Sequence, residues 1–178
     1  TLRTMAKFGV EVDILDNGWH IRGRQRYVPS DYTTDGDWSQ AAFFLVSGAI
    51  GGEVTVTNAN IDSAQGDRRI AAILREFGAE VLQDGGTITV KKAPMRAIEI
   101  NAAQIPDLVP VLSVVAAKAR GTTEIKSCAR LRLKESDRIE AVYNMIKNLG
   151  GNISVENDCI IIKGAGLRGG SIDSVNDH

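Results

Sequence analysis

The segment "RRIAAILREFGAEVLQDGGTITVKK" (residues 68–92) joins a helical pattern to two short alternating strands. Apolar residues recur at helical spacing as far as Phe77, and Gly78 suits a helix end that enters a left-handed conformation. The strands that follow alternate around the turn residues 84–86, "DGG", which is typical of a hairpin. The segment therefore predicts a helix followed by a β-hairpin.

Two further segments repeat this pattern, "TLRTMAKFGVEVDILDNGWHIRG" (residues 1–23) and "AVYNMIKNLGGNISVENDCIIIKG" (residues 141–164). Their glycines, Gly9 and Gly150, stand 69 residues before and 72 residues after Gly78. Equal order and nearly equal spacing are typical of an internal repeat. Chance similarity between ordinary helix-and-hairpin segments is the alternative.

A second kind of helix precedes the later two copies, in "WSQAAFFLVSGAIGGEVTVTN" (residues 38–58) and "LVPVLSVVAAKARGTTEIKS" (residues 108–127). Both helices are nearly apolar, so we expect them to be buried among neighbouring elements. With the short strand "AIEIN" (residues 97–101) in front, the last unit is predicted to be βαβαββ. The fold class is therefore α/β, built from repeated βαβαββ units.

Composition excludes several classes of function. The chain has 21 basic and 22 acidic residues, and a net charge of -1 provides no general attraction for nucleic acid or an anionic membrane. Cys128 and Cys159 form no metal-ligand pattern, so no metal is expected and the thiols are expected to be reduced, as in a cytoplasmic protein. The longest nearly apolar run, residues 109–117, is too short to span a membrane. The chain begins at Thr1 without a methionine, and we expect it to be a piece of a longer protein.

The charged stretch "RLRLKESDRIE" (residues 130–140) precedes and opens the last long helix, which Ser136 or Asp137 is expected to cap. A helix N-terminus favours an anion, and side-chain donors surround this one: Arg130, Arg132, Lys134 and Arg138. Leucines at 131 and 133 alternate with the cations, which predicts that one face of the loop is held against the core. We therefore expect an anion site, with solvated charges at a helix start as the alternative.

A second candidate is Asp107 in "QIPDLVPVLSV" (residues 104–114). An aspartate before an apolar helix is first of all an N-cap, and the same holds for Asp37 and Ser39 before the earlier helix. Asp107 and the Lys134 loop nevertheless open consecutive helices of one unit, so both are expected on the same side. A carboxylate beside several cations stays ionised and can accept a proton from a substrate hydroxyl.

Five motifs together resemble the 5-enolpyruvylshikimate-3-phosphate (EPSP) synthase family. They are "RLRLKESDRI" (130–139), "GDWSQAAFFL" (36–45), "QGD" (65–67), "IPDLVPVL" (105–112) and "NDH" (176–178). The resemblance covers essentially the whole chain. It implies an inside-out α/β barrel of two lobes, each of three βαβαββ units, of which this chain is a part.

The implied reaction transfers the enolpyruvyl group of phosphoenolpyruvate to the 5-hydroxyl of shikimate 3-phosphate, with no cofactor. By resemblance, Asp107 contacts the shikimate hydroxyls and accepts the proton. Lys134 binds shikimate beside the reacting hydroxyl and shuttles its proton. Glu135 exchanges a proton with the methylene carbon, and Arg138 binds phosphoenolpyruvate. Some members have an asparagine at Arg130 that touches shikimate 3-phosphate, so Arg130 is a weaker binding candidate.

The resemblance also divides the chain. Residues 1–34 match the last helix and hairpin of one lobe, and residues 35–178 match about two units of the other. Several substrate-binding elements of the family lie outside these residues, so the 178-residue chain alone is expected to be inactive. The full-length enzyme is expected to be a monomer that binds its two small-molecule substrates but neither nucleic acid nor a membrane. The alternatives are the UDP-N-acetylglucosamine enolpyruvyl transferase of the same fold and a non-catalytic anion- or RNA-binding repeat module.

Overall fold

The computed structural model describes residues 1–177, which fall into two compact units that divide between Thr34 and Asp35. The first unit contains one helix and one hairpin. Its elements are α1 (Leu2–Lys7), β1 (Val12–Leu15) and β2 (Gly18–Ile21). Gly9 follows the helix with φ of 79°, the left-handed conformation that the repeat predicts for this position. The assignment of the two units to two lobes stays a prediction.

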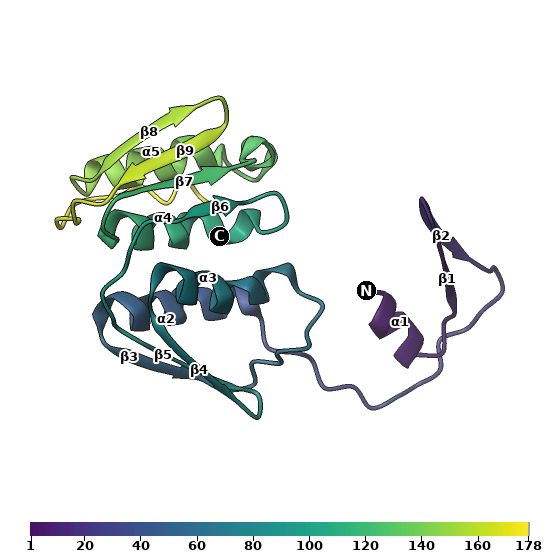
Figure 1. Cartoon of the computed structure of the whole chain (residues 1–178). Coiled ribbons are helices and arrows are strands. Elements are labelled where there is room, and N and C mark those ends of the chain that lie inside the picture. The colour runs from purple at the N-terminus through teal and green to yellow at the C-terminus, as the bar shows by residue number, and fades with distance from the viewer. Residues whose placement is uncertain (178) are drawn as a thin grey trace. The chain divides into compact units, whose positions relative to one another are not determined.

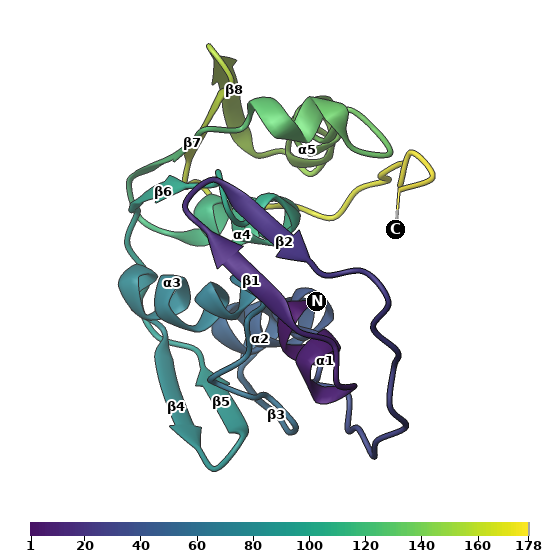
Figure 2. The same cartoon turned by 90° about the vertical axis from the view of Figure 1, so that its right-hand side faces the viewer.

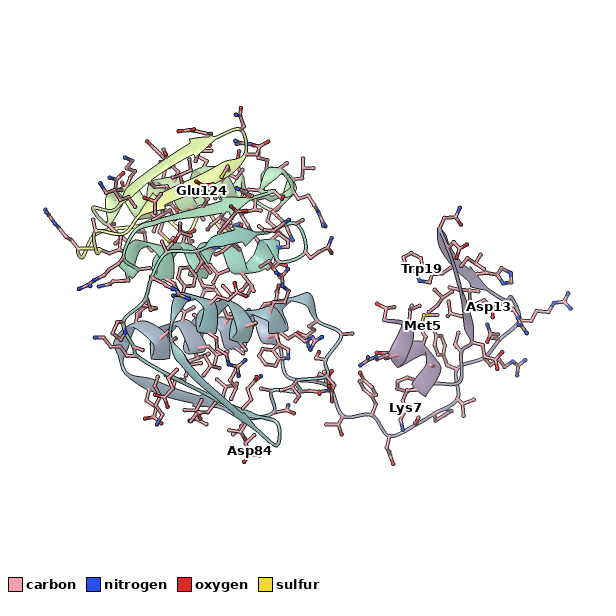
Figure 3. The ribbon with its side chains drawn as sticks, viewed as in Figure 1. Met5, Lys7, Asp13, Trp19, Asp84 and Glu124 are labelled. Atoms are coloured by element: carbon pink, nitrogen blue, oxygen red, sulfur yellow. The ribbon has the colours of Figure 1, made fainter. Side chains whose placement is uncertain are left out.

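The second unit begins with two helices and a three-stranded sheet. Its elements are α2 (Trp38–Gly51), β3 (Glu53–Val56), the 3₁₀ turn η1 (Gly66–Arg69), α3 (Ile70–Phe77), β4 (Glu80–Asp84) and β5 (Thr87–Lys91). The strand order is β3-β5-β4, and both pairings are antiparallel. Asp84 lies at the tip of the β4–β5 hairpin (Figure 3). The helix and hairpin predicted for residues 68–92 are confirmed.

The rest of the second unit forms a complete βαβαββ sequence. Its elements are β6 (Glu99–Asn101), the 3₁₀ turn η2 (Pro106–Leu108), α4 (Val109–Lys118), β7 (Thr122–Lys126), the 3₁₀ helix η3 (Ala129–Leu133), α5 (Arg138–Asn148), β8 (Asn152–Glu156) and β9 (Cys159–Lys163). The strand order is β6-β7-β9-β8, with β6 parallel to β7 and the other pairs antiparallel. The predicted unit is therefore confirmed element by element.

The helices of the second unit lie between its two sheets, as Figures 1 and 2 both show. Helix α2 packs against α4, and each sheet contributes fully buried side chains from its inner face, such as Ile88 and Ile160. Helix α4 is buried along most of its length, as its composition predicts. For α2 the prediction is partly wrong, because Phe43 and Phe44 are 53% and 62% exposed. This arrangement brings the N-termini of α2, α4 and α5 around one cavity, described below.

Glycine is required where the helices turn into the hairpins. Gly78 has φ of 110°, and a Cβ there would lie 2.8 Å from the carbonyl oxygen of Pro94. Gly150 has φ of 78° at the matching place after α5. Other residues would be strained in this backbone conformation. No helix within the described residues is long and apolar enough to cross a membrane.

Candidate functional site

Asp107 lies in η2, immediately before α4, but it does not cap that helix. The carboxylate instead accepts hydrogen bonds from the Lys134 ammonium, at 2.9 Å, and from the Arg138 guanidinium. The N-cap interpretation of Asp107 is therefore wrong. For Asp37 it is correct, because its carboxylate accepts hydrogen bonds from the backbone N–H groups of Ser39 and Gln40.

The loop that carries Lys134 is fixed by the start of α5. Asp137 caps this helix, with its Oδ1 3.0 Å from the backbone nitrogen of Ile139 and 3.2 Å from that of Glu140. A cap of this kind typically stabilises a helix by about 1 kcal/mol. With the helix start fixed, Lys134 lies where η3 ends and faces Asp107. The two residues that open consecutive helices thus meet on one side, as the repeat predicts.

Arg138 lies at the centre of a cluster of charged side chains, although only 7% of the residue is exposed. Its guanidinium binds three carboxylates, those of Asp107, Glu135 and Asp177. Two of its nitrogens lie 2.8 Å from the two Asp177 oxygens, which is bidentate geometry, and Glu135 Oε2 lies at 3.2 Å. Ser136 Oγ also donates to Asp177, at 2.6 Å. The hydrogen bond from Arg138 to Asp177 is the main reason that the arginine pKa is raised, so the side chain stays charged.

Opposing effects set the charge of Asp107. Partial burial of its carboxyl group raises the pKa. The hydrogen bonds from Lys134 and Arg138, together with their positive charges, outweigh burial and hold the pKa below its ordinary value. At neutral pH Asp107 is therefore ionised.

These groups line one cavity of about 470 Å³. Its polar lining comes from three helix starts and the C-terminal segment: Asp37, Ser39, Gln40, Asp107, Lys134, Glu135, Arg138, Asp173, Ser174 and Asp177. Its apolar lining consists of Phe43, Pro110, Ala141, Val142, Met145, Ile172 and Val175. The cavity therefore combines anion-binding cations with carboxylates that can move protons.

Two of the expected cations point elsewhere. Arg130 Nη1 donates to the backbone oxygen of Ala103 at 3.2 Å, and Arg130 does not line the cavity. Arg132 is paired with Asp137 and Asp158 instead. The sequence predicts that leucines and cations alternate between two faces of this loop. The loop is instead a 3₁₀ helix, in which residues three apart share a face.

The leucines of the same loop separate in the same way. Leu131 is fully buried, whereas Leu133 is 85% exposed. The prediction that both hold the loop against the core is therefore wrong for Leu133.

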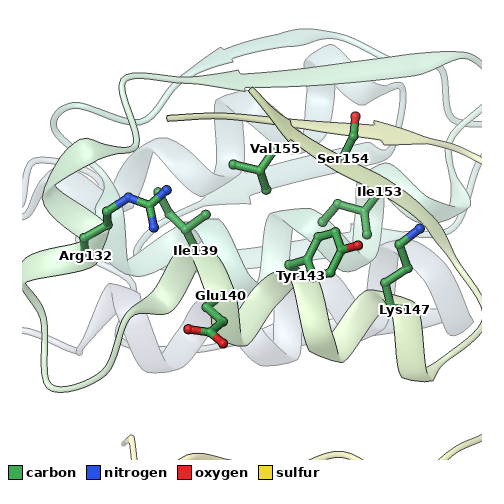
Figure 4. A pocket seen from close by; sticks show the side chains of 8 residues that line it. All are labelled: Arg132, Ile139, Glu140, Tyr143, Lys147, Ile153, Ser154 and Val155. Carbon is green, nitrogen blue, oxygen red and sulfur yellow. The ribbon is translucent and has the colours of Figure 1, made fainter. Parts of the chain in front are cut away.

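A wider groove of about 610 Å³ lies between α5 and β8 and contains none of the predicted catalytic residues (Figure 4). Arg132, Glu140, Tyr143 and Lys147 reach it from η3 and α5, and Ile153 and Val155 from β8. The Lys147 ammonium lies 5.6 Å from the centre of the Tyr143 ring. This groove provides residues of α5 that serve as controls outside the candidate site.

Sequence reasoning from the residues missed the contribution of Asp177, because it comes from 39 positions beyond Arg138. The signal was present in the "NDH" motif, whose last residue lies outside the described residues. Within residues 1–177 there is no group of three or more His, Cys, Asp or Glu side chains arranged to hold a metal ion. The carboxylates and cations that line the cavity are groups that can transfer protons and bind anions.

Comparisons with known proteins agree in family and in fold. The family model of EPSP synthase (3-phosphoshikimate 1-carboxyvinyltransferase) matches residues 1–178. A 3-phosphoshikimate 1-carboxyvinyltransferase of Methanocorpusculum labreanum is 37% identical over 179 residues, and one of Clostridium novyi is 41% identical over 182 residues. Each alignment covers 100% of this chain, but the chain spans only 42% and 41% of these relatives.

Solved structures give the same result. An EPSP synthase from Acinetobacter baumannii matches with a TM-score of 0.84 and 30% identity, over 99% of this chain and 44% of that one. The enolpyruvyl transferase NikO from Streptomyces tendae has a TM-score of 0.70 at 19% identity, over 91% of this chain and 39% of that one, and supports the fold alone. The predicted α/β enolpyruvyl transferase fold is confirmed, and the chain belongs to the EPSP synthase family.

Proposed function

We propose that this chain carries the proton-transfer part of an active site that joins the enolpyruvyl group of phosphoenolpyruvate to the 5-hydroxyl of shikimate 3-phosphate. The contact of Lys134 and Arg138 with the Asp107 carboxylate, inside a cavity that Glu135 also lines, is the observation that carries the proposal. Family membership supports the choice of substrates, since the relatives are named 3-phosphoshikimate 1-carboxyvinyltransferases. Because the chain spans 42% of the first relative, we further propose that turnover requires a polypeptide of the relatives' length.

The addition step needs a base at the hydroxyl and an acid at carbon. The substrate hydroxyl oxygen attacks C2 of phosphoenolpyruvate while its proton passes to a base. Asp107 is that base, because its carboxylate is ionised, whereas the Lys134 ammonium in contact with it is a donor. Lys134 stabilises the charge on the attacking oxygen and relays the proton. Glu135, after it has left Arg138 and taken up a proton from solvent, gives that proton to the methylene carbon, which becomes a methyl group in the tetrahedral adduct.

The elimination step reverses the role of Glu135. The C–O bond to phosphate breaks, and Glu135 removes a proton from the methyl group to restore the methylene. Phosphate leaves with the electron pair of the broken bond, and the proton that Asp107 took from the hydroxyl passes to the phosphate or to solvent. Both steps use the same carboxyl group in opposite protonation states, which requires Glu135 to reach the methylene carbon in each.

Anion binding at Arg138 explains how Glu135 is released for this role. The Arg138 guanidinium already binds three carboxylates, and we propose that a bound anion displaces one of them. Glu135 has the longest contact, at 3.2 Å, and the most exposed side chain, at 51%, whereas Asp177 is 12% exposed. Glu135 is therefore the partner that leaves.

The remaining roles also stay proposals. Arg130 stays a candidate for binding shikimate 3-phosphate, although its guanidinium donates to the backbone oxygen of Ala103 and does not line the cavity. We propose a cytoplasmic monomer as the full-length form, with the two small molecules as its partners and without nucleic acid, membrane or cofactor.

The test is phosphate release by a polypeptide of the relatives' length that contains residues 1–178. We expect turnover with phosphoenolpyruvate and shikimate 3-phosphate, and none when UDP-N-acetylglucosamine replaces the shikimate. Asp107→Asn and Glu135→Gln should each lower turnover by about 10²- to 10⁴-fold. Glu140→Gln is the matched control, because Glu140 is an exposed acid of α5 that lines the groove between α5 and β8. Turnover with the UDP-sugar, or RNA binding without turnover, would contradict the proposal.

A further inference from the structure

Asp67 is a buried carboxylate that none of the steps above uses. It lies in η1 within the "QGD" motif, and only 8% of the residue is exposed. Aspartate is rarely buried without a specific partner, because removal of a charge from water is costly. The hydroxyl of Ser39 donates a hydrogen bond of 2.6 Å to its Oδ2.

Ser39 connects this buried acid to the cavity. It lies in the first turn of α2 and lines the cavity that contains Asp107 and Lys134, and its backbone N–H donates to the Asp37 carboxylate. A serine hydroxyl has one proton and two lone pairs. Because the hydroxyl proton is donated to Asp67, only the lone pairs of the Ser39 oxygen are available to a group in the cavity.

The neighbours of Asp67 make separate contacts with the start of α2 and with the loop before Asp107. Gln65 Oε1 accepts a hydrogen bond of 3.0 Å from the backbone N–H of Trp38, and Gln65 Nε2 donates one of 2.9 Å to the backbone oxygen of Gly36. A Cβ at Gly66 would lie 2.7 Å from the backbone oxygen of Gln104, so η1 also packs closely against the loop that precedes Asp107. The "QGD" motif thus joins the start of α2 to the Asp107 loop.

The charges around Asp67 are those of the candidate site. Burial raises the pKa of its carboxyl group, and the hydrogen bond from Ser39 opposes that effect. The Asp107 and Asp37 carboxylates raise the pKa further, and the Lys134 ammonium lowers it. Asp67 is therefore coupled electrostatically to the two residues expected to handle the substrate hydroxyl.

We propose that Asp67 is a positioning residue, which orients the Ser39 hydroxyl as a hydrogen-bond acceptor for a hydroxyl group of the substrate held beside Asp107. The inference rests on the proposed function. It deepens that proposal by assigning a role to the "QGD" motif and a second acceptor to the hydroxyl-bearing substrate. Asp107 accepts the reacting proton, whereas Ser39 selects for a substrate that offers a further hydroxyl donor.

Substitutions at both members of the pair test this role in the full-length polypeptide. Asp67→Asn keeps the shape, but the amide can present either an oxygen or an NH₂ group to Ser39 and so no longer fixes the direction of the hydroxyl. Ser39→Ala removes the acceptor. Each should raise KM for shikimate 3-phosphate by about five- to tenfold, as expected for one neutral hydrogen bond, with kcat and the KM for phosphoenolpyruvate little changed. The double variant should show no more than the larger single effect, because both changes remove the same interaction.

Gln65→Ala is the matched control. It breaks the other hydrogen bonds between η1 and the start of α2 but leaves the Ser39–Asp67 pair intact. A merely structural role for Asp67 would make Gln65→Ala raise the same KM as strongly. That outcome, additive effects in the double variant, or an unchanged KM in folded single variants would overturn the inference.

The pH dependence of KM provides a second measurement. When Asp67 becomes protonated, it can itself donate to Ser39, and the hydroxyl proton is free to turn into the cavity. KM for shikimate 3-phosphate should therefore rise as the pH falls through the raised pKa of Asp67, and Asp67→Asn should abolish this rise. Asp37, Asp107 and Lys134 face the same group and are retained in every variant. No turnover by the unsubstituted polypeptide would refute the proposed function itself, whereas active protein with unaffected variants would refute only the positioning role.

Discussion

Replacement of Arg138 by methionine should destabilise the second unit far more than the same change at Arg132. Both arginines bind more than one carboxylate, but the Arg138 side chain is 9% exposed and that of Arg132 is 43% exposed. Arg138→Met leaves three carboxylates without their shared cation. Two of them regain water, because the side chains of Asp107 and Glu135 are 41% and 51% exposed, whereas Asp177 stays largely buried at 12%.

The magnitude follows from this difference in exposure. Removal of one partner from a fully buried ion pair costs roughly 3–5 kcal/mol. Since only one of the three carboxylates remains buried, we expect a loss of about 2–3 kcal/mol for Arg138→Met, which corresponds to a fall of roughly 5–10 °C in Tm. Arg132→Met should leave Tm nearly unchanged, because exposed ion pairs contribute little to stability.

Trp38 is a suitable probe for thermal unfolding of the second unit, because it is 1% exposed in α2. A Trp19→Phe background removes the signal of the other tryptophan, which lies in β2 of the first unit and is 67% exposed. Equal shifts in Tm for the two arginine variants, or stabilisation by Arg138→Met, would refute the reasoning.

Low pH should reduce the loss of Tm that Arg138→Met causes. Asp107 has a lowered pKa in the folded chain, so its contribution to stability is present above its ordinary value of 3.8 and is lost as the pH falls through the lowered pKa. The difference in Tm between the unsubstituted chain and Arg138→Met should therefore narrow below pH 3.8.

Three further outcomes are expected of the same chain. The pKa of Asp67 is raised in the folded chain, so the stability that its carboxyl group contributes is lost as the pH rises from 3.8 through that pKa. The Tm of Asp67→Asn relative to the Tm of the unsubstituted chain should therefore rise over the same pH range. Gly164→Ala should lower Tm strongly, since the new Cβ would lie 1.6 Å from a backbone carbonyl oxygen, whereas Gly51→Ala meets nothing within 4 Å and should be neutral or slightly stabilising. The half-buried Cys159 thiol should react with a disulfide reagent well before the buried Cys128 thiol, whose pKa burial raises to about 11, and the two rates should become similar in denaturant.

The repeat explains why so much of the fold was predictable. Helix ends at Gly78 and Gly150 depend on local backbone conformation, and hairpins depend on local turn residues, so both appear directly in the sequence. The meeting of Asp107 and Lys134 was also predictable, because the starts of consecutive helices in one βαβαββ unit fall on the same side.

What the sequence did not predict depends on tertiary contacts or on a change of helical period. Alternation placed Leu133 against the core, but a 3₁₀ helix over residues 129–133 exposes it. An aspartate at position 107 has the usual features of an N-cap, and only the approach of Lys134 and Arg138 gives its carboxylate other partners. The interaction of Asp67 with Ser39 spans 28 positions, beyond any local pattern.

The most direct test of the central claim uses NMR to measure the exchange of the methylene protons of phosphoenolpyruvate with solvent deuterium in the presence of the full-length polypeptide. With shikimate 3-phosphate present, the proposal predicts deuterium in the methylene group, because Glu135 adds and removes a proton at that carbon. Glu135→Gln should abolish the exchange while both substrates still bind, and Glu140→Gln should leave it unchanged. Exchange that continues at the unsubstituted rate in Glu135→Gln would contradict the assignment of the proton-transfer site.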